Sequence, residues 1–164
     1  MEYVSIVPRP PLDGLIDDLY YLAGAPPYVR LTLPPAPTAL LIVNLGAPFR
    51  IRGGADITTA EYVDGCVVTT PTRCYEFGYP PQTRSVGVHF KPWGLAPFLP
   101  MPAAELCDRP VTVEQVWGRP AVAEPDCGLG LERDRLLVIL PEPQLQPFVA
   151  GSLALMYVTS SPST

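Results

Sequence analysis

Hydrophobic positions near the start of the chain have the spacing of an amphipathic helix. Leucine and isoleucine recur over residues 12–22 at intervals of three and four, while Asp13, Asp17 and Asp18 fall on the opposite side. Prolines precede this stretch and Gly24 follows it, as expected at the two ends of a helix. The pattern predicts a helix of about three turns.

From residue 28 to residue 90 the pattern changes to short strands separated by turn residues. Residues 39–43 are continuously apolar, which is typical of a strand buried on both faces. Residues 85–90 alternate instead, with Val86, Val88 and Phe90 on one face. Further strands are expected at residues 28–33, 49–52, 62–63, 66–68 and 74–77. So many short strands predict a β-sandwich or a small barrel.

Short helical signals follow the last of these strands. They cover residues 93–99 and 102–107, and Thr112 with Gln115 has the form of a capping box that begins a helix over residues 112–117. Further helices are expected at residues 131–140 and 144–157, before a frayed tail. The predicted fold class is therefore a β-rich α+β fold with flanking short helices and C-terminal helices.

Composition supports this prediction and excludes a helical bundle. Apolar residues make up 48% of the 164 residues and charged residues only 16%, as in a globular domain. The 23 prolines are spread along the chain and interrupt most windows that are long enough for a helix. The length suits a single β domain, followed by the helical C-terminal segment.

Charge and cysteine content argue against several functions. The net charge is −5 and the arginines are diluted by apolar neighbours, so we expect no direct DNA binding. The four cysteines form no C-x-x-C pair, which predicts free thiols and no metal site. No signal peptide and no membrane-spanning stretch are visible. We therefore expect a cytoplasmic protein without a cofactor and without membrane contact.

Catalytic chemistry is not indicated by the sequence. With a single histidine, His89, any Ser–His or Cys–His pair must use that residue, and its position on an alternating strand favours a structural or pocket-lining role. One histidine also cannot supply the metal ligands of a cupin enzyme. No catalytic residues are predicted, and the chain is not expected to be an enzyme.

An ordered set of motifs resembles a group of bacterial AraC-type transcription regulators. The segment HFKPWGLAPFLPMPAAELCDRPVTVEQVWG at residues 89–118 resembles that group's RFxPGGxxxxLxxPxxELxxRxVxLxxLWG stretch. The segments PRPPL at residues 8–12 and LIVNLG at 41–46 are similar to its opening and to its LxxNLG core. The resemblance covers residues 3–118, although His89 and Trp93 stand where basic and small residues are usual.

In that family a cupin-like β-barrel with flanking helices senses a small molecule or mediates dimerisation, and a C-terminal pair of helix-turn-helix units reads DNA. The resemblance thus implies a barrel-like sensor domain over residues 1–126 and a helical segment with a frayed tail over residues 127–164. By this resemblance we expect the DNA-binding half to be absent from the chain, so that DNA contact would occur only through that further domain.

Two sets of candidate residues follow. A pocket for a small hydrophobic ligand is expected at Asn44, Arg73, Tyr75 and His89, although Asn44 could instead cap a strand end and the others could pair across strands. A homodimer is expected through the apolar face of the helix over residues 144–157, at Leu145, Phe148, Val149, Leu153, Met156 and Tyr157. Packing of that face onto the chain's own barrel is the alternative.

Three functions remain open at this point. The first is the ligand-sensing and dimerising domain of a regulator. The second is a free-standing cupin-like protein that binds a small hydrophobic compound. The third, a degenerate cupin enzyme, is disfavoured by the lone histidine. The reading frame downstream would separate the first two, because a helix-turn-helix pair encoded there decides for the regulator.

Overall fold

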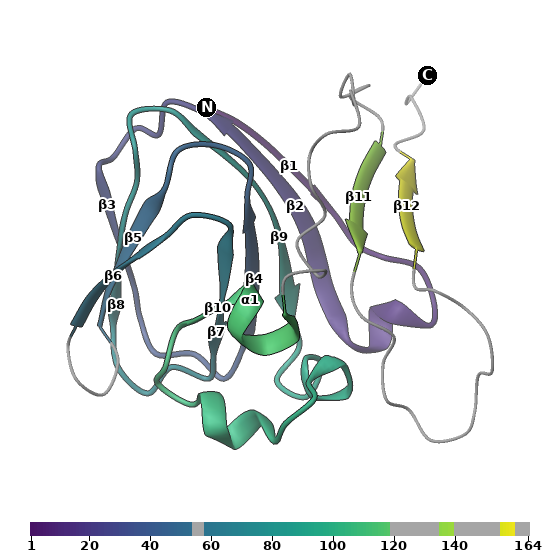
Figure 1. The fold of residues 1–164 in the computed structure, drawn as a ribbon. Coiled ribbons are helices and arrows are strands. Elements are labelled where there is room, and N and C mark those ends of the chain that lie inside the picture. Colours follow the sequence, from purple (N-terminus) through teal and green to yellow (C-terminus); the bar gives the residue numbers. More distant parts are fainter. Residues whose placement is uncertain (54–57, 119–134, 140–154, 160–164) are drawn as a thin grey trace.

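The computed structural model describes residues 1–53, 58–118, 135–139 and 155–159, the last two ranges as backbone strands only. Ten strands form two antiparallel sheets that face each other (Figure 1). The six-stranded sheet contains, in spatial order, β1 (Glu2–Ile6), β2 (Ile16–Gly24), β9 (Thr83–Phe90), β4 (Ala39–Asn44), β7 (Gly65–Thr69) and β10 (Val111–Thr112). The four-stranded sheet contains β3 (Arg30–Leu33), β8 (Tyr75–Gly78), β5 (Phe49–Gly53) and β6 (Thr58–Tyr62).

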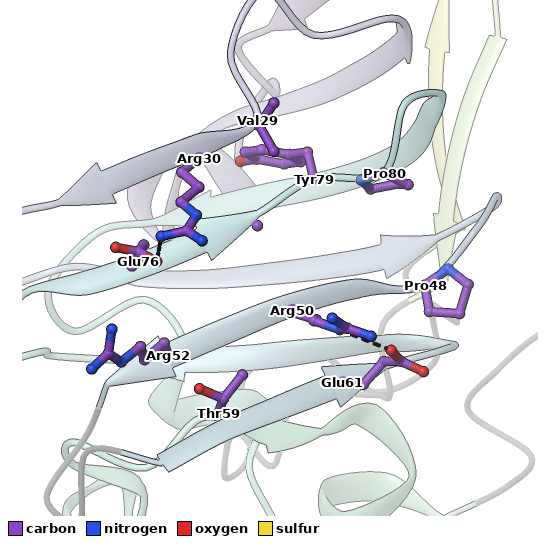
Figure 2. A pocket seen from close by; sticks show the side chains of 11 residues that line it. Val29, Arg30, Pro48, Arg50, Arg52, Thr59, Glu61, Glu76, Tyr79 and Pro80 are labelled. Atoms are coloured by element: carbon purple, nitrogen blue, oxygen red, sulfur yellow. Dashed lines mark hydrogen bonds and ion pairs between the residues drawn. The ribbon is translucent and has the colours of Figure 1, made fainter.

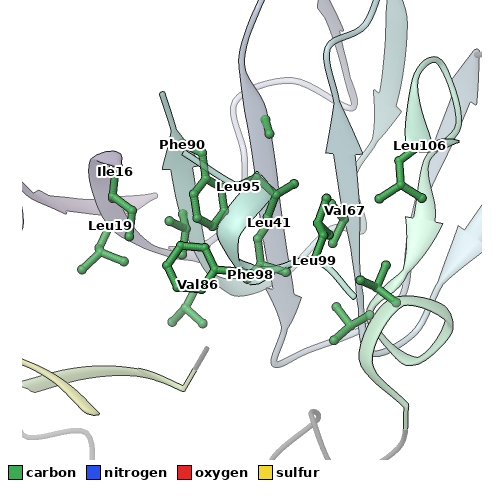
Figure 3. Close-up of a cluster of buried hydrophobic side chains, with 14 residues drawn as sticks. Ile16, Leu19, Leu41, Val67, Val86, Phe90, Leu95, Phe98, Leu99 and Leu106 are labelled. Atoms are coloured by element: carbon green, nitrogen blue, oxygen red, sulfur yellow. The ribbon is translucent and has the colours of Figure 1, made fainter. Parts of the chain in front are cut away.

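The predicted β-rich fold with flanking short helices is therefore confirmed. Two apolar cores explain why the middle strands of the larger sheet are apolar on both faces. Between the sheets, Phe77 and Ile51 of the smaller sheet pack against Ile42. On the opposite face of the larger sheet, Leu41 packs with side chains from the segment after β9 (Figure 3). The continuous apolar run of β4 thus serves both cores, as expected for a strand covered on both sides.

The segment after β9 consists of short helical turns that cover the larger sheet. These are the 3-10 helices η2 (Ala96–Phe98) and η3 (Ala103–Leu106) and the helix α1 (Val113–Trp117). The predicted capping box is present: the Thr112 hydroxyl accepts a hydrogen bond from Gln115 N at 3.1 Å, and Thr112 N donates to Gln115 Oε1 at 2.8 Å. The short helices predicted in this region are confirmed at these places.

The predicted helix over residues 12–22 is wrong. Apart from the 3-10 turn η1 (Leu12–Gly14), the segment is strand β2. A β-bulge explains the misleading spacing, because the register of β2 with β9 shifts between Ile16 and Asp18. The extra residue places Ile16 and Leu19 in the same core although they are three positions apart, as they would be on a helix.

The C-terminal helices are also wrong where the structure describes that region. β11 (Arg135–Ile139) and β12 (Leu155–Thr159) form an antiparallel hairpin pair. Both are short apolar runs, and periodicity alone does not distinguish a strand from a helix in such runs. Of the expected dimer residues, Met156 and Tyr157 lie on β12 and not on a helix; the other four lie outside the described residues. The division at residue 126 also lies outside them.

No helix in the described ranges is long and apolar enough to cross a membrane.

Candidate functional site

The outer face of the four-stranded sheet carries an open hollow of about 870 Å³ (Figure 2). Its floor is formed by side chains that point away from the apolar core, because the inward positions of the same strands are taken by residues such as Ile51 and Phe77. The hollow is lined by Val29, Arg30, Pro48, Arg50, Arg52, Thr59, Glu61, Glu76, Gly78, Tyr79 and Pro80.

Strand register assembles this hollow from residues that are distant in sequence. Arg30 of β3 and Arg50 of β5 are both paired with Gly78 of β8, so the three positions form one row across the sheet. In the neighbouring row, Glu76 is paired with Arg52. Paired residues in adjacent strands point to the same face. The glycine therefore leaves an opening in the floor between two arginines.

The charges in the hollow are partly paired. Arg30 contacts Glu76 at 3.3 Å, and Arg50 contacts Glu61 at 3.1 Å. Arg52 forms no ion pair within the described part of the chain. Both ion pairs are largely exposed to solvent, and such pairs contribute about 1 kcal/mol or less. Three guanidinium groups face two carboxylates, so the hollow is locally cationic on an otherwise acidic protein.

One end of the hollow is apolar. Val29, Tyr79 and Pro80 lie together there, and Pro48 lies apart from them beside the ion pair of Arg50 and Glu61 (Figure 2). Tyr79 N donates to the carbonyl oxygen of Val29 at 3.0 Å, which connects the two chain segments at this end. Burial, with a smaller effect of Tyr28, raises the pKa of the Tyr79 phenol to about 12. Tyr79 lines the hollow, while its ring also stacks on Phe77 in the core between the sheets, with ring centroids 6.4 Å apart.

A cavity at the mouth of the space between the two sheets is much smaller than the outer hollow. It measures about 20 Å³, which is room for about one water molecule. The ring of Tyr20 occupies the neighbouring space: a Cβ atom at Gly87 would lie 2.3 Å from that ring. A drug-sized ligand cannot enter this cavity without displacing core side chains.

The predicted pocket residues Asn44 and Arg73 have structural contacts in the fold. The Asn44 amide donates to the carbonyl oxygens of Gly46, Ala47 and Val63, as a strand-end cap would. Arg73 lies at the β7–β8 turn beside Asp108. There the Thr72 hydroxyl, followed by the Thr72 backbone N–H and the Arg73 groups, lowers the pKa of the Asp108 carboxyl.

Tyr75 is 1% exposed, and its hydroxyl has no hydrogen-bond partner among the described residues. Burial raises the pKa of this phenol to about 12, so it stays protonated. None of Asn44, Arg73 and Tyr75 lines the outer hollow, and Asn44 alone of the three lines the small cavity between the sheets.

The fourth predicted residue, His89, belongs to a polar cluster on the larger sheet. Its Nδ1 donates to the carboxylate of Asp18, which also accepts from the Ser5 hydroxyl. The ring stacks on Tyr20 with centroids 5.0 Å apart. Asp18 lies between the serine and the histidine, so His89 does not contact the serine hydroxyl as the base of a Ser–His pair would. The contact with Asp18 fixes the position of the His89 ring.

The described residues form no metal site, and their cysteines are not paired with one another. In the described ranges, no three His, Cys, Asp or Glu side chains are grouped closely enough to hold a metal ion. Cys66 is buried, Cys74 is exposed and Cys107 is intermediate, and all three are free thiols. Burial raises the pKa of the Cys66 thiol. Cys127 lies outside the described residues.

We predict that Cys66 resists alkylation in the native protein, because reaction requires the thiolate and access to it. After a short iodoacetamide pulse, mass spectrometry should find Cys66 labelled roughly a hundredfold more slowly than Cys74. In denaturant the two residues should react at similar rates. Equal labelling of both cysteines in native protein would contradict the buried position of Cys66.

The outer hollow was not predicted from the sequence. The available signal is the alternation in Arg50-Ile51-Arg52, where the apolar residue points inward and the two arginines point outward. Arg30 occupies an equivalent outward position in β3. Local alternation identifies outward positions, but only the register of three strands brings these arginines into one site.

Comparisons with known proteins identify a family but no activity. Residues 4–112 match a family described as "Domain of unknown function (DUF6597)". No curated protein matches the sequence. Among solved structures the chain is similar to a putative ethanolamine utilization protein Q from Salmonella typhimurium LT2. That match has 18% identity and a TM-score of 0.36, and it covers 54% of this chain and 67% of that chain. A likeness at this level carries no inference about ligand or partner.

Proposed function

Because the chain belongs to the DUF6597 family, whose description assigns no function, we propose from its own geometry that it binds a small organic molecule in the outer hollow. One observation supports this proposal above all. The hollow combines arginine side chains with an apolar end, within a volume of about 870 Å³. Ligand sites in proteins measure roughly 300–1,000 Å³ and combine apolar walls with a few polar groups.

The proposed role is binding without chemical conversion. The polar side chains of the hollow are three arginines, two glutamates and a threonine. Both glutamates form ion pairs with arginines, so the contacts that the structure gives them are with cations and not with a nucleophile that they could activate. The Ser5, Asp18 and His89 cluster has the wrong order for nucleophilic attack. These features favour a binding protein over an enzyme.

A finer proposal places this binding in an AraC-type transcription regulator of the cytoplasm, acting as a homodimer. It rests on the ordered motifs over residues 3–118, above all the segment at residues 89–118. The net charge of −5 favours DNA contact through another domain. A helix-turn-helix pair encoded directly downstream would support this role. A downstream frame without one would favour the free-standing binding protein.

Binding in the hollow can be tested by protein NMR with a fragment library that contains neutral, anionic and cationic compounds. We expect some fragments to shift the amide signals of Arg30, Arg50 and Gly78, and not those of Ile42 and Ser85 at the cavity between the sheets. The proposal fails if no fragment binds, or if binding maps only to the cavity between the sheets.

A matched pair of variants sharpens the same test. In Gly78→Leu a side chain fills the floor of the hollow, and the fragment-induced shifts should disappear. In Gly14→Leu the same change is made at a position where an added Cβ meets nothing within 4 Å. That variant should bind the fragments as the unchanged protein does.

A further inference from the structure

We infer that the ligand of the outer hollow is an organic carboxylate with an apolar body, held with its carboxylate above Gly78 between Arg30 and Arg50. This inference rests on the proposed function, because it names the ligand class of the same site. It is drawn from the spacing of the arginines, the empty position at Gly78, the balance of charge and the apolar end of the hollow.

The spacing suits one carboxylate. Arg30 and Arg50 lie on strands either side of β8, both paired with Gly78. Neighbouring strands are about 4.8 Å apart, so the two arginine backbones are separated by roughly 10 Å. Two long side chains that start this far apart can converge on one small anion above the glycine. The planar guanidinium group matches a carboxylate through two parallel hydrogen bonds.

The backbone does not require a glycine at position 78. Its φ lies outside the left-handed region, and a Cβ atom there would meet Arg50 Cβ at 3.7 Å, an ordinary contact. At Gly65, by contrast, φ is +135° and a Cβ atom would lie 2.0 Å from the carbonyl oxygen of Ile42. Gly65 is needed for folding, whereas the glycine at 78 keeps open a space that a side chain could otherwise fill.

The charge balance favours an anion. Glu76 contacts Arg30 and Glu61 contacts Arg50. Arg52 has no ion-pair partner within the described ranges. A guanidinium group has five N–H donors, so a single carboxylate contact leaves donors free for a ligand. The exposed ion pairs contribute little to stability. A ligand carboxylate can therefore share or replace these contacts at small cost.

The apolar end determines what is attached to the carboxylate. Val29 is 75% exposed beside Tyr79 and Pro80. A ligand ring or short aliphatic chain would cover this surface while its carboxylate reached the arginines. Apolar surface that the ligand covers is removed from water, which favours binding. An inorganic anion has no such body and gains nothing from this end of the hollow.

The test compares benzoate, benzamide, benzylamine and inorganic phosphate by NMR titration of the full chain. Benzoate should bind in the hollow at least about tenfold more tightly than its neutral amide, because charged hydrogen bonds to arginine are roughly twice as strong as neutral ones. Benzylamine should not bind there, and phosphate should bind more weakly than benzoate. Benzoate affinity should also fall as salt is raised.

Two arginine-to-glutamine variants distinguish a contact inside the hollow from the general effect of removing one positive charge. Arg50→Gln removes one of the two arginines placed around the carboxylate, so it should weaken benzoate binding about fivefold and leave benzamide binding almost unchanged. Arg84→Gln removes an exposed arginine from β9, outside the hollow, and should leave both unchanged.

The outcomes distinguish this inference from the function on which it rests. If benzamide or benzylamine binds in the hollow as tightly as benzoate, the hollow is a binding site but the carboxylate assignment is wrong. If phosphate binds as tightly as benzoate, the inference that the ligand carries an apolar body is wrong. If no compound of the fragment library binds there, the proposed function itself fails and the ligand class falls with it.

Discussion

Replacing Gly94 with alanine is expected to destabilise the fold by about 3 kcal/mol or more. A Cβ atom at this position would lie 1.7 Å from the carbonyl oxygen of Leu15, whereas carbon and oxygen atoms normally approach to roughly 3.3 Å. The obstacle is backbone, so no side chain can rotate away. The same oxygen accepts a hydrogen bond from Lys91 N at 3.0 Å, and moving it would break that contact.

The neighbouring Gly14 provides a matched control. A Cβ atom there meets nothing within 4 Å, so Gly14→Ala should change the free energy of unfolding by no more than about 0.5 kcal/mol. Urea denaturation of both variants measures the difference. Equal stability of the two variants would show that the loop after β9 does not pass against Leu15 as described.

Replacing Phe90 with alanine is expected to cost about 3–5 kcal/mol, the usual range for a fully buried aromatic residue. Phe90 is 0% exposed at the end of β9, and its ring centroid lies 5.8 Å from that of Phe98 in η2 (Figure 3). The change removes the ring that joins the larger sheet to the helical segment covering it. The resulting cavity cannot close fully, because both neighbouring elements are held by other contacts.

The control for this variant is Tyr3→Ala, in the same sheet. Tyr3 is 52% exposed on the edge strand β1, so removal of its ring should cost about 1 kcal/mol or less. A double-mutant cycle between Phe90 and Phe98 should find a coupling of about 0.5–1.5 kcal/mol. Stability losses of equal size for Phe90→Ala and Tyr3→Ala would contradict the buried core on this face of the sheet.

Local patterns in the sequence were sufficient for core strands such as β4 and β9 and for the capped helix. The apolar run of β4 and the alternation of β9 appear directly in the sequence, because burial on two faces or on one face dictates which side chains are apolar. The capping box of α1 was predictable for a similar reason, since both of its hydrogen bonds join residues three positions apart.

Elements whose backbone hydrogen bonds go to distant partners were predicted less well. The bulge in β2 is defined by its register with β9, and it gave Ile16 and Leu19 a helical spacing. The sequence of β11 and that of β12, each taken alone, predicted a helix, although the two segments pair as antiparallel strands. Edge strand β1 was not predicted, because its residues are mostly exposed and therefore show no alternation.

The sequence by itself determined a β-rich domain with a net negative charge. Only the tertiary structure decided where a ligand could bind. Asn44 and Tyr75 were candidates because of their residue type, but the fold uses one as a cap and buries the other. Nothing in the sequence around Arg30 or Arg50 indicates a shared site, because only strand pairing places both arginines beside Gly78. Residue type and local spacing are properties of one segment, whereas the hollow depends on the register of three strands, which long-range pairing sets.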